Sequence, residues 1–157
     1  MSTVAERMAE AFKQATGEAV EAPKYLSVTR GKYTLDAVPG YGGCRYVVTA
    51  TAWVADSLKV EYRAKVQTSS TSVSAMANAL REARMRARAL ASLSDVLGSN
   101  GWRVRRLTLT DETALQASME DSCIQVYGDG TFRGYDDAAV RFGADAFAVA
   151  LERIRGR

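Results

Sequence analysis

The chain has 157 residues, a length that predicts one domain with a hydrophobic core of its own. It is 47% hydrophobic and 25% charged with a net charge of +3, which is typical of soluble globular proteins and excludes a disordered chain. The sequence contains no histidine, which excludes Ser-His-Asp and Cys-His nucleophile systems and most zinc sites.

The cysteine content and the hydropathy indicate the compartment. Cys44 and Cys123 are too few for a disulfide scaffold and lack the spacing of metal ligands. No apolar run approaches the ~18 residues that a membrane span needs. We therefore expect a cytoplasmic protein that has no cofactor and no membrane partner.

The N-terminal part of the chain is expected to form one helix and two short strands. Residues 3–16 place apolar side chains on one stripe at helical spacing, with Ser2 as the N-cap candidate and Gly17 past the end. Segments 25–30 and 32–38 have the composition of strands on either side of a glycine turn.

Segment 44–67 alternates between apolar and polar residues in two stretches, which predicts an antiparallel hairpin. A three-residue loop at 55–57 keeps both apolar sets on one face, and in that register Trp53 lies opposite Lys59. The other face carries arginine, lysine, threonine and a tryptophan. Three interpretations of this face stay open: a nucleic-acid surface on which a base stacks, a solvated face, or a face covered by a helix.

Residues 73–97 predict the longest helix, which ends at Gly98. Alanine dominates its apolar stripe, so the backbone of this helix can lie close to a sheet. Segment 102–110 then predicts a strand with one tryptophan and three arginines. These residues indicate either phosphate contacts with base stacking or the charged protection of an edge strand.

The last part of the chain predicts a short helix over 111–119 capped by Asp111, a hairpin with a type I′ turn at 129–130, and a final helix that starts near 136–137. Acidic residues cluster here, and paired carboxylates could hold Mg²⁺ for phosphoryl chemistry. Most of them occupy positions typical of caps and turns, which gives them a structural explanation. The cluster consists of Glu120, Asp121, Asp129, Asp136 and Asp137.

Charge is distributed unevenly along the chain. Residues 59–106 contain ten Lys or Arg against three Asp or Glu, whereas residues 111–145 contain eight acids against two arginines. This asymmetry indicates a polyanion site, or two patches that pair either between chains or within one chain.

One stretch and the order of the elements carry a resemblance to nucleic-acid-binding folds. The stretch "ALREARMRARALASLSDVLG" after a strand hairpin resembles the core of single-strand annealing recombination proteins. The element order is similar to that of double-stranded-RNA-binding domains, but "TSSTSVSAMAN" lacks the cations expected at the start of their helix. No internal repeat appears, and the sequence is assigned to no family.

We therefore expect one α+β domain, in which an antiparallel sheet of about four to six strands is packed by the long alanine-rich helix and by the N- and C-terminal helices. The leading hypothesis is a non-enzymatic, homo-oligomeric protein that binds single-stranded DNA or RNA with low sequence specificity. The alternatives are a self-assembling structural protein, such as a virion or scaffold component, and a small metal-dependent phosphoryl-transfer enzyme. In the leading hypothesis two tryptophans stack bases and seven cations contact phosphate: Arg45, Trp53, Lys59, Arg63, Lys65, Trp102, Arg103, Arg105 and Arg106.

Overall fold

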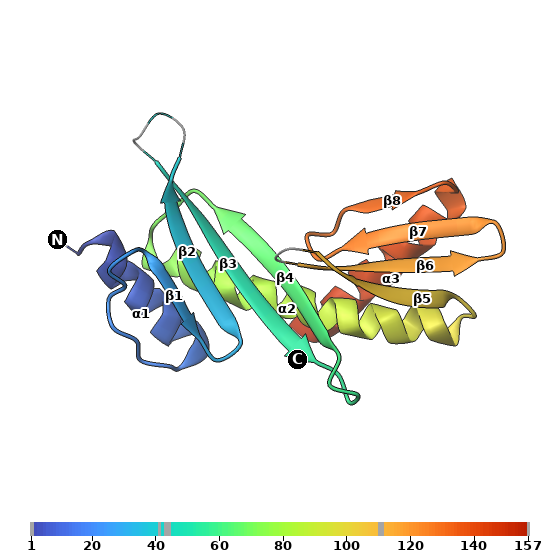
Figure 1. Cartoon of the computed structure of the whole chain (residues 1–157), viewed down its shortest axis with the longest axis horizontal. Helices are drawn as coiled ribbons and strands as arrows, with labels where there is room; N and C mark the ends of the chain where they lie inside the picture. The colour runs from blue at the N-terminus through green and yellow to red at the C-terminus, as the bar shows by residue number, and fades with distance from the viewer. Residues whose placement is uncertain (1, 41, 43–44, 110–111, 157) are drawn as a thin grey trace. The chain divides into compact units, whose positions relative to one another are not determined.

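The computed structural model shows three helices and two four-stranded antiparallel sheets in the part of the chain that it describes (Figure 1). The α+β class, the antiparallel pairing and the three long helices expected from the sequence are therefore confirmed. The structure describes residues 2–40, 42, 45–109 and 112–156. Cys44 and the proposed cap residue Asp111 lie outside these ranges.

The contacts within the chain divide it into two compact units. The first consists of residues 1–52 and 65–84, and the second of residues 53–64 and 85–157. Each unit has a hydrophobic core of its own, and the expectation of a single domain stays a prediction.

The core of the first unit lies between one face of a sheet and two helices. The sheet has the strand order β1-β2-β3-β4, so each strand pairs with its neighbour in sequence. Alternate residues of β2 and β3, such as Leu35 and Val48, are buried against Phe12 of the first helix and Leu80 of the second. The elements are α1 (Val4–Thr16), β1 (Ser27–Arg30), β2 (Tyr33–Pro39), β3 (Tyr46–Ala55), β4 (Glu61–Thr68) and α2 (Val73–Ser99), the last of which continues into the second unit.

The second unit contains a sheet with the order β5-β6-β7-β8, packed against the C-terminal part of α2 and against α3. Leu115 of β6 and Val126 of β7 are buried against leucines of α2 such as Leu93. A Cβ atom at Gly143 of α3 would lie only 2.8 Å from Cδ1 of Ile124, so this glycine lets the helix approach β7 closely. The elements are β5 (Arg103–Thr108), β6 (Thr113–Met119), β7 (Ser122–Tyr127), β8 (Phe132–Gly134) and α3 (Asp137–Arg155).

Local capping chemistry explains where the terminal helices begin and end. The N-cap of α1 is Thr3 instead of the expected Ser2, because Thr3 forms a reciprocal capping box with Glu6. Gly17 ends the helix with a φ of 77°, a left-handed conformation that glycine adopts without strain. Asp136 caps α3 by accepting a hydrogen bond from the backbone N–H of Ala138, as the sequence predicts.

The hairpin between β3 and β4 has the expected loop length but a different loop position. The backbone N–H of Lys59 donates to the carbonyl of Asp56, and that of Asp56 donates to the carbonyl of Val60. The three loop residues are therefore 57–59 instead of 55–57, and Lys59 takes the left-handed position with a φ of 62°. The predicted pairing of Trp53 with Lys59 is wrong. Leu58, which the predicted register places on the core face, lies in the loop and is 82% exposed, whereas the other apolar residues of that face stay on the core side.

Two predictions for the C-terminal part are corrected by the second sheet. Residues 113–119 form β6 and not a helix, because their backbone pairs with β5 on one edge and with β7 on the other. The β7–β8 turn is a three-residue loop at 128–130, closed by hydrogen bonds from Gly130 N–H to the Tyr127 carbonyl and from Tyr127 N–H to the Thr131 carbonyl. The prediction of a type I′ turn at 129–130 is therefore wrong. In the observed register Phe132 pairs with Val126.

The strands form two sheets where the sequence predicts one. The first sheet ends at β4, and β5, the strand that follows α2, pairs with β6 in a separate sheet. A helix, four sequential antiparallel strands and another helix thus occur twice with α2 shared, an order that no sequence repeat indicates.

Candidate nucleic-acid interface

The predicted nucleic-acid-binding residues belong to different parts of the structure. Arg45 is exposed before β3, and Lys65 is half-buried on β4; both belong to the first unit. The remaining seven belong to the second unit, where they divide between the end of the β3–β4 hairpin and β5. The two groups lie in different sheets, so the structure does not bring the nine residues onto one sheet face.

Trp53, at the end of β3, already has a cationic partner within the protein. The guanidinium carbon of Arg63 lies 4.5 Å from the centroid of the indole ring, a cation–π contact. Arg63 also donates to a carboxylate oxygen of Glu61 at 3.0 Å. The ring of Trp53 and the charge of Arg63 are therefore both used in contacts within the chain, while Lys59 is exposed in the hairpin loop.

Trp102, which precedes β5, is half-buried and packs at the edge of the second core. Its ring stacks on Phe142 of α3, with 6.0 Å between the ring centroids and an interplanar angle of 13°. Stacking of this kind is the contact that a nucleic-acid base would otherwise make. The described structure thus gives Trp102 a packing role.

The three arginines of β5 divide between the two faces of the second sheet. Arg103 and Arg105 alternate with Val104, which belongs to the core side, so they point to the opposite face. Arg106 pairs with Leu115 on the core side, remains exposed at the sheet edge and donates to Thr108 at 3.0 Å. In the described part of the chain, the side chains of Arg103 and Arg105 form neither a hydrogen bond nor an ion pair.

The strand register places a row of polar side chains across all four strands of the second sheet. Arg105 pairs with Gln116, Gln116 pairs with Gln125, and Gln125 pairs with Arg133. Direct partners in antiparallel strands share a face, so these four side chains project to the side away from α2 and α3. We call this surface, together with Arg103, the arginine face.

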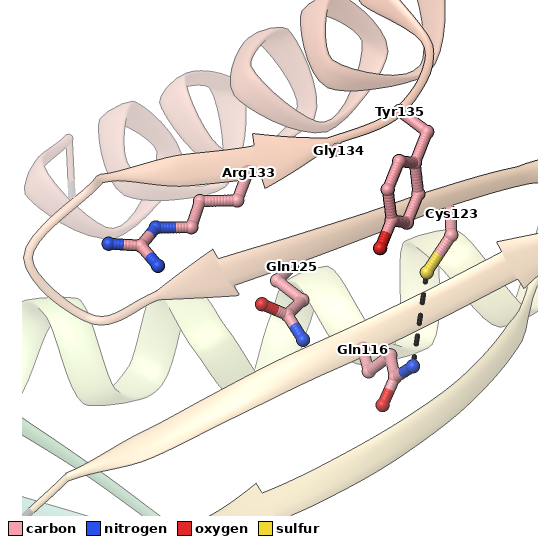
Figure 2. Close-up of a pocket in the computed structure, with 6 residues that line it drawn as sticks. All are labelled: Gln116, Cys123, Gln125, Arg133, Gly134 and Tyr135. Carbon is pink, nitrogen blue, oxygen red and sulfur yellow. Dashed lines mark hydrogen bonds between the residues drawn. The ribbon is translucent and has the colours of Figure 1, made fainter.

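A shallow hollow and two tyrosines complete the arginine face. The hollow has a volume of about 370 Å³ and contains the residues drawn in Figure 2. In this view Tyr135 points toward Cys123, whose sulfur accepts a weak hydrogen bond from the Gln116 amide at 3.9 Å (Figure 2). Tyr135 is 94% exposed, and Tyr127 on β7 donates to the amide oxygen of Gln125 at 3.2 Å.

The four strands of the second sheet carry positive charge only. They contain four arginines and neither aspartate nor glutamate, whereas the acids of this region lie in the connections between the strands. Glu112 and Asp129 line a hollow together with Tyr127 and Arg133, so both acids would oppose a polyanion there. Partial burial tends to raise the pKa of Asp129, but hydrogen bonds from Thr131 and the charge of Arg86 outweigh this, so the pKa lies below its ordinary value.

Sequence reasoning missed five residues of this face: Gln116, Gln125, Tyr127, Arg133 and Tyr135. Segment 113–119 was expected to be helical, and a helix would not have placed Gln116 in line with Arg105. The available signal was the alternation of Leu115, Ala117 and Met119 with Gln116 and Ser118, which has a period of two.

Three further findings bear on what the chain can bind. Among the described residues, no cysteine or acidic side chains gather in groups of three or more that could hold a metal ion. None of the described helices combines the length and the apolar character of a membrane span. Comparison of the chain with known protein families, curated proteins and solved structures finds no match.

Proposed function

We propose that the protein binds single-stranded nucleic acid, with little sequence preference, on the arginine face. The observation that supports this most directly is the row Arg105, Gln116, Gln125 and Arg133 across four strands that contain no acid. Open antiparallel sheets that combine cations with aromatic rings are a common way to hold single strands.

The spacing of the arginines fits an extended backbone that crosses the sheet. Neighbouring strands lie about 4.8 Å apart, so Arg105 and Arg133 on the two edge strands are separated by about 14 Å at their Cα atoms. Arg103 lies two residues from Arg105 on the same strand and face, which adds a third cation about 7 Å away. Three guanidinium groups at these separations can each reach a different phosphate.

The central side chains of the arginine face supply contacts to the bases. Tyr127 is half-buried and lies below the guanidinium of Arg133, with 6.0 Å from its ring centroid to the guanidinium carbon. Tyr135 is almost fully exposed and can stack on a base without displacing another side chain. Gln116 and Gln125 both donate and accept hydrogen bonds, so they accommodate any base edge and give little sequence preference.

This proposal keeps Arg103 and Arg105 as phosphate contacts and transfers the stacking role from the tryptophans to Tyr135. Arg63, Trp53 and Trp102 each have contacts within the chain that a ligand would have to replace. Contacts from Arg45, Lys59, Lys65 and Arg106 remain predictions. The protein would act in the cytoplasm, as an oligomer and without a cofactor.

The test is binding of a fluorescently labelled single-stranded oligonucleotide at low salt, measured by anisotropy. We compare the wild type with the triple variant Arg103→Gln, Arg105→Gln and Arg133→Gln, and expect at least a tenfold loss of affinity. The control variant carries the same change at Arg30, Arg88 and Arg141, which lie outside the second sheet. Equal losses in both variants, or no binding by the wild type at 50 mM salt, would rule out the arginine face as the site.

A further inference from the structure

A groove with an apolar centre runs between α2 and α3 in the second unit. It has a volume of about 230 Å³, and its lining includes Val96 of α2 and Phe142, Ala146 and Val149 of α3. Phe142 is 36% exposed and Val149 is 51% exposed. Half-exposed apolar side chains that line one groove are typical of a surface that another protein covers.

One acidic and one basic side chain line the groove. Asp145 and Arg153 both line it, and both are exposed. In the described part of the chain the side chains of both form neither an ion pair nor a hydrogen bond, although their neighbours Glu152 and Arg155 pair with each other at 3.5 Å. The acid and the base are eight residues apart, about 12 Å along α3, which is too far for them to pair within the helix.

The two charges are placed symmetrically about Val149. Asp145 precedes Val149 by four residues and Arg153 follows it by four, so each lies about 6 Å from Val149 along the helix. A twofold axis through Val149 would therefore bring Asp145 of one copy against Arg153 of the other, twice, with the two valines in contact at the centre. This is the self-complementarity that an isologous interface requires.

We propose that a second copy of this chain docks in the α2–α3 groove, with the two α3 helices antiparallel and related by a twofold axis at Val149. We name a second copy as the occupant because the charges along the groove are complementary to those of an antiparallel copy of the same helix. Asp145 and Arg153 together give the lining no net charge, so it offers a polyanion or an anionic membrane no net electrostatic attraction.

The size of the surface predicts a weak dimer. Helix α3 has 19 residues and is about 28 Å long; with the adjacent part of α2 it forms a strip about 20 Å wide. The projected area of about 560 Å² per copy is below the roughly 800 Å² of a standard interface. We therefore expect a dissociation constant in the micromolar range. The complementary ion pairs determine the relative orientation of the two copies more than their affinity.

The test is sedimentation equilibrium of the full chain between about 1 and 500 μM, a range that brackets micromolar dissociation. The variants Asp145→Arg and Arg153→Asp each replace two attractive pairs by two repulsive ones, and should weaken the dimer by roughly tenfold or more. A mixture of these two variants restores both pairs in a heterodimer, because one copy then has two arginines and the other two aspartates. The mixture should therefore dimerise like the wild type.

Two further variants make the test specific to the groove. Val149→Glu places two facing carboxylates at the centre and should weaken the dimer by roughly a hundredfold. The control Arg141→Asp makes the same charge change as Arg153→Asp on α3 but outside the groove, and should leave the dimer intact. Circular dichroism of each variant checks that the helices are unchanged.

Three results would overturn the proposal: a monomeric wild type throughout the concentration range, a dimer that survives Val149→Glu, or a mixture of the charge variants that stays monomeric. If Val149→Glu does not fold, the mixture decides by itself. No residue of the groove belongs to the second sheet, so oligonucleotide binding and dimerisation can fail independently.

Discussion

Gly128, in the loop between β7 and β8, is predicted to tolerate no side chain. A Cβ atom at this position would lie 2.8 Å from Cβ and 3.2 Å from Cα of Ala64 on β4, and 3.3 Å from Cδ1 of Leu90 on α2. The φ of Gly128 is not positive, so the requirement for glycine comes from this close approach and not from the backbone conformation.

The contacts give the magnitude of the effect. The Cα and Cβ atoms of Ala64 are fixed by the strand and cannot rotate away, so Gly128→Ala must shift the loop or β4. Overpacking of this kind costs about 1–3 kcal/mol, and the reduced entropy of the unfolded chain offsets about 0.5 kcal/mol. We expect a net loss of about 0.5–2.5 kcal/mol and a fall in Tm of about 1–10 °C.

The assay is thermal and urea unfolding of Gly128→Ala, Ala64→Gly and the double variant. Ala64→Gly removes the atom that clashes, so the double variant should be more stable than the sum of the two single losses by about 1 kcal/mol. Gly98→Ala is the matched control, because a Cβ atom at Gly98 meets nothing within 4 Å. In the helix it should be neutral or stabilise by up to about 1 kcal/mol.

A neutral Gly128→Ala variant would show that β4 does not approach the β7–β8 loop in solution. Strict additivity with Ala64→Gly would have the same meaning, because two residues in contact must show a coupling energy. Either result would refute the packing of these two segments within the second unit.

The other predictions concern charge and backbone strain. The logarithm of oligonucleotide affinity should fall linearly with the logarithm of salt concentration. The three-arginine variant should make this slope shallower by about 2, because each phosphate contact contributes about 0.7. An unchanged slope would contradict phosphate binding by these side chains. Lys59→Gly should stabilise the protein in urea by about 0.5–1 kcal/mol by relieving a φ of 62°, whereas destabilisation would argue against the loop at 57–59. The pKa of Asp136 is lowered by a hydrogen bond from Ser122 and by backbone N–H groups of α3. Its charge therefore stabilises the fold above about pH 5, and this contribution is lost as pH falls below about 4. Asp136→Asn, which keeps the cap, should be less stable than wild type at pH 7 and equal to it in acid; a constant difference would exclude the charge as the cause.

The β3–β4 hairpin shows how far a periodic pattern determines a register. Alternation identifies the two faces, but every shift by an even number of residues keeps them, so the loops at 55–57 and 57–59 fit the pattern equally well. The side chain of Asp56 decides between them, because its Oδ1 accepts hydrogen bonds from the backbone N–H of both Leu58 and Val60. An aspartate at the first position of a turn is a local signal that could have indicated this loop.

Strand β6 shows where local preference is overruled. Alanine, leucine, glutamine and methionine between Thr113 and Met119 favour a helix by intrinsic propensity. The segment forms a central strand because β5 and β7 offer it hydrogen bonds on both edges and the core buries Leu115 and Ala117. These gains come from residues distant in sequence, so no local window contains them.

The sequence by itself determined the three long helices, most strands and the side of each element that faces a core. These features depend on side-chain direction, which follows the local periods of 3.6 and 2 residues. Only the tertiary structure decided which strands share a sheet, and therefore which cations lie on one sheet face. Arg105 shares a face with Arg133 across β6 and β7, whereas Arg63 belongs to the other sheet. The same packing decided that Trp102 stacks on Phe142. Strand partners and ring contacts are selected by the burial of surfaces far apart in the chain, so a pattern read along the chain does not contain them.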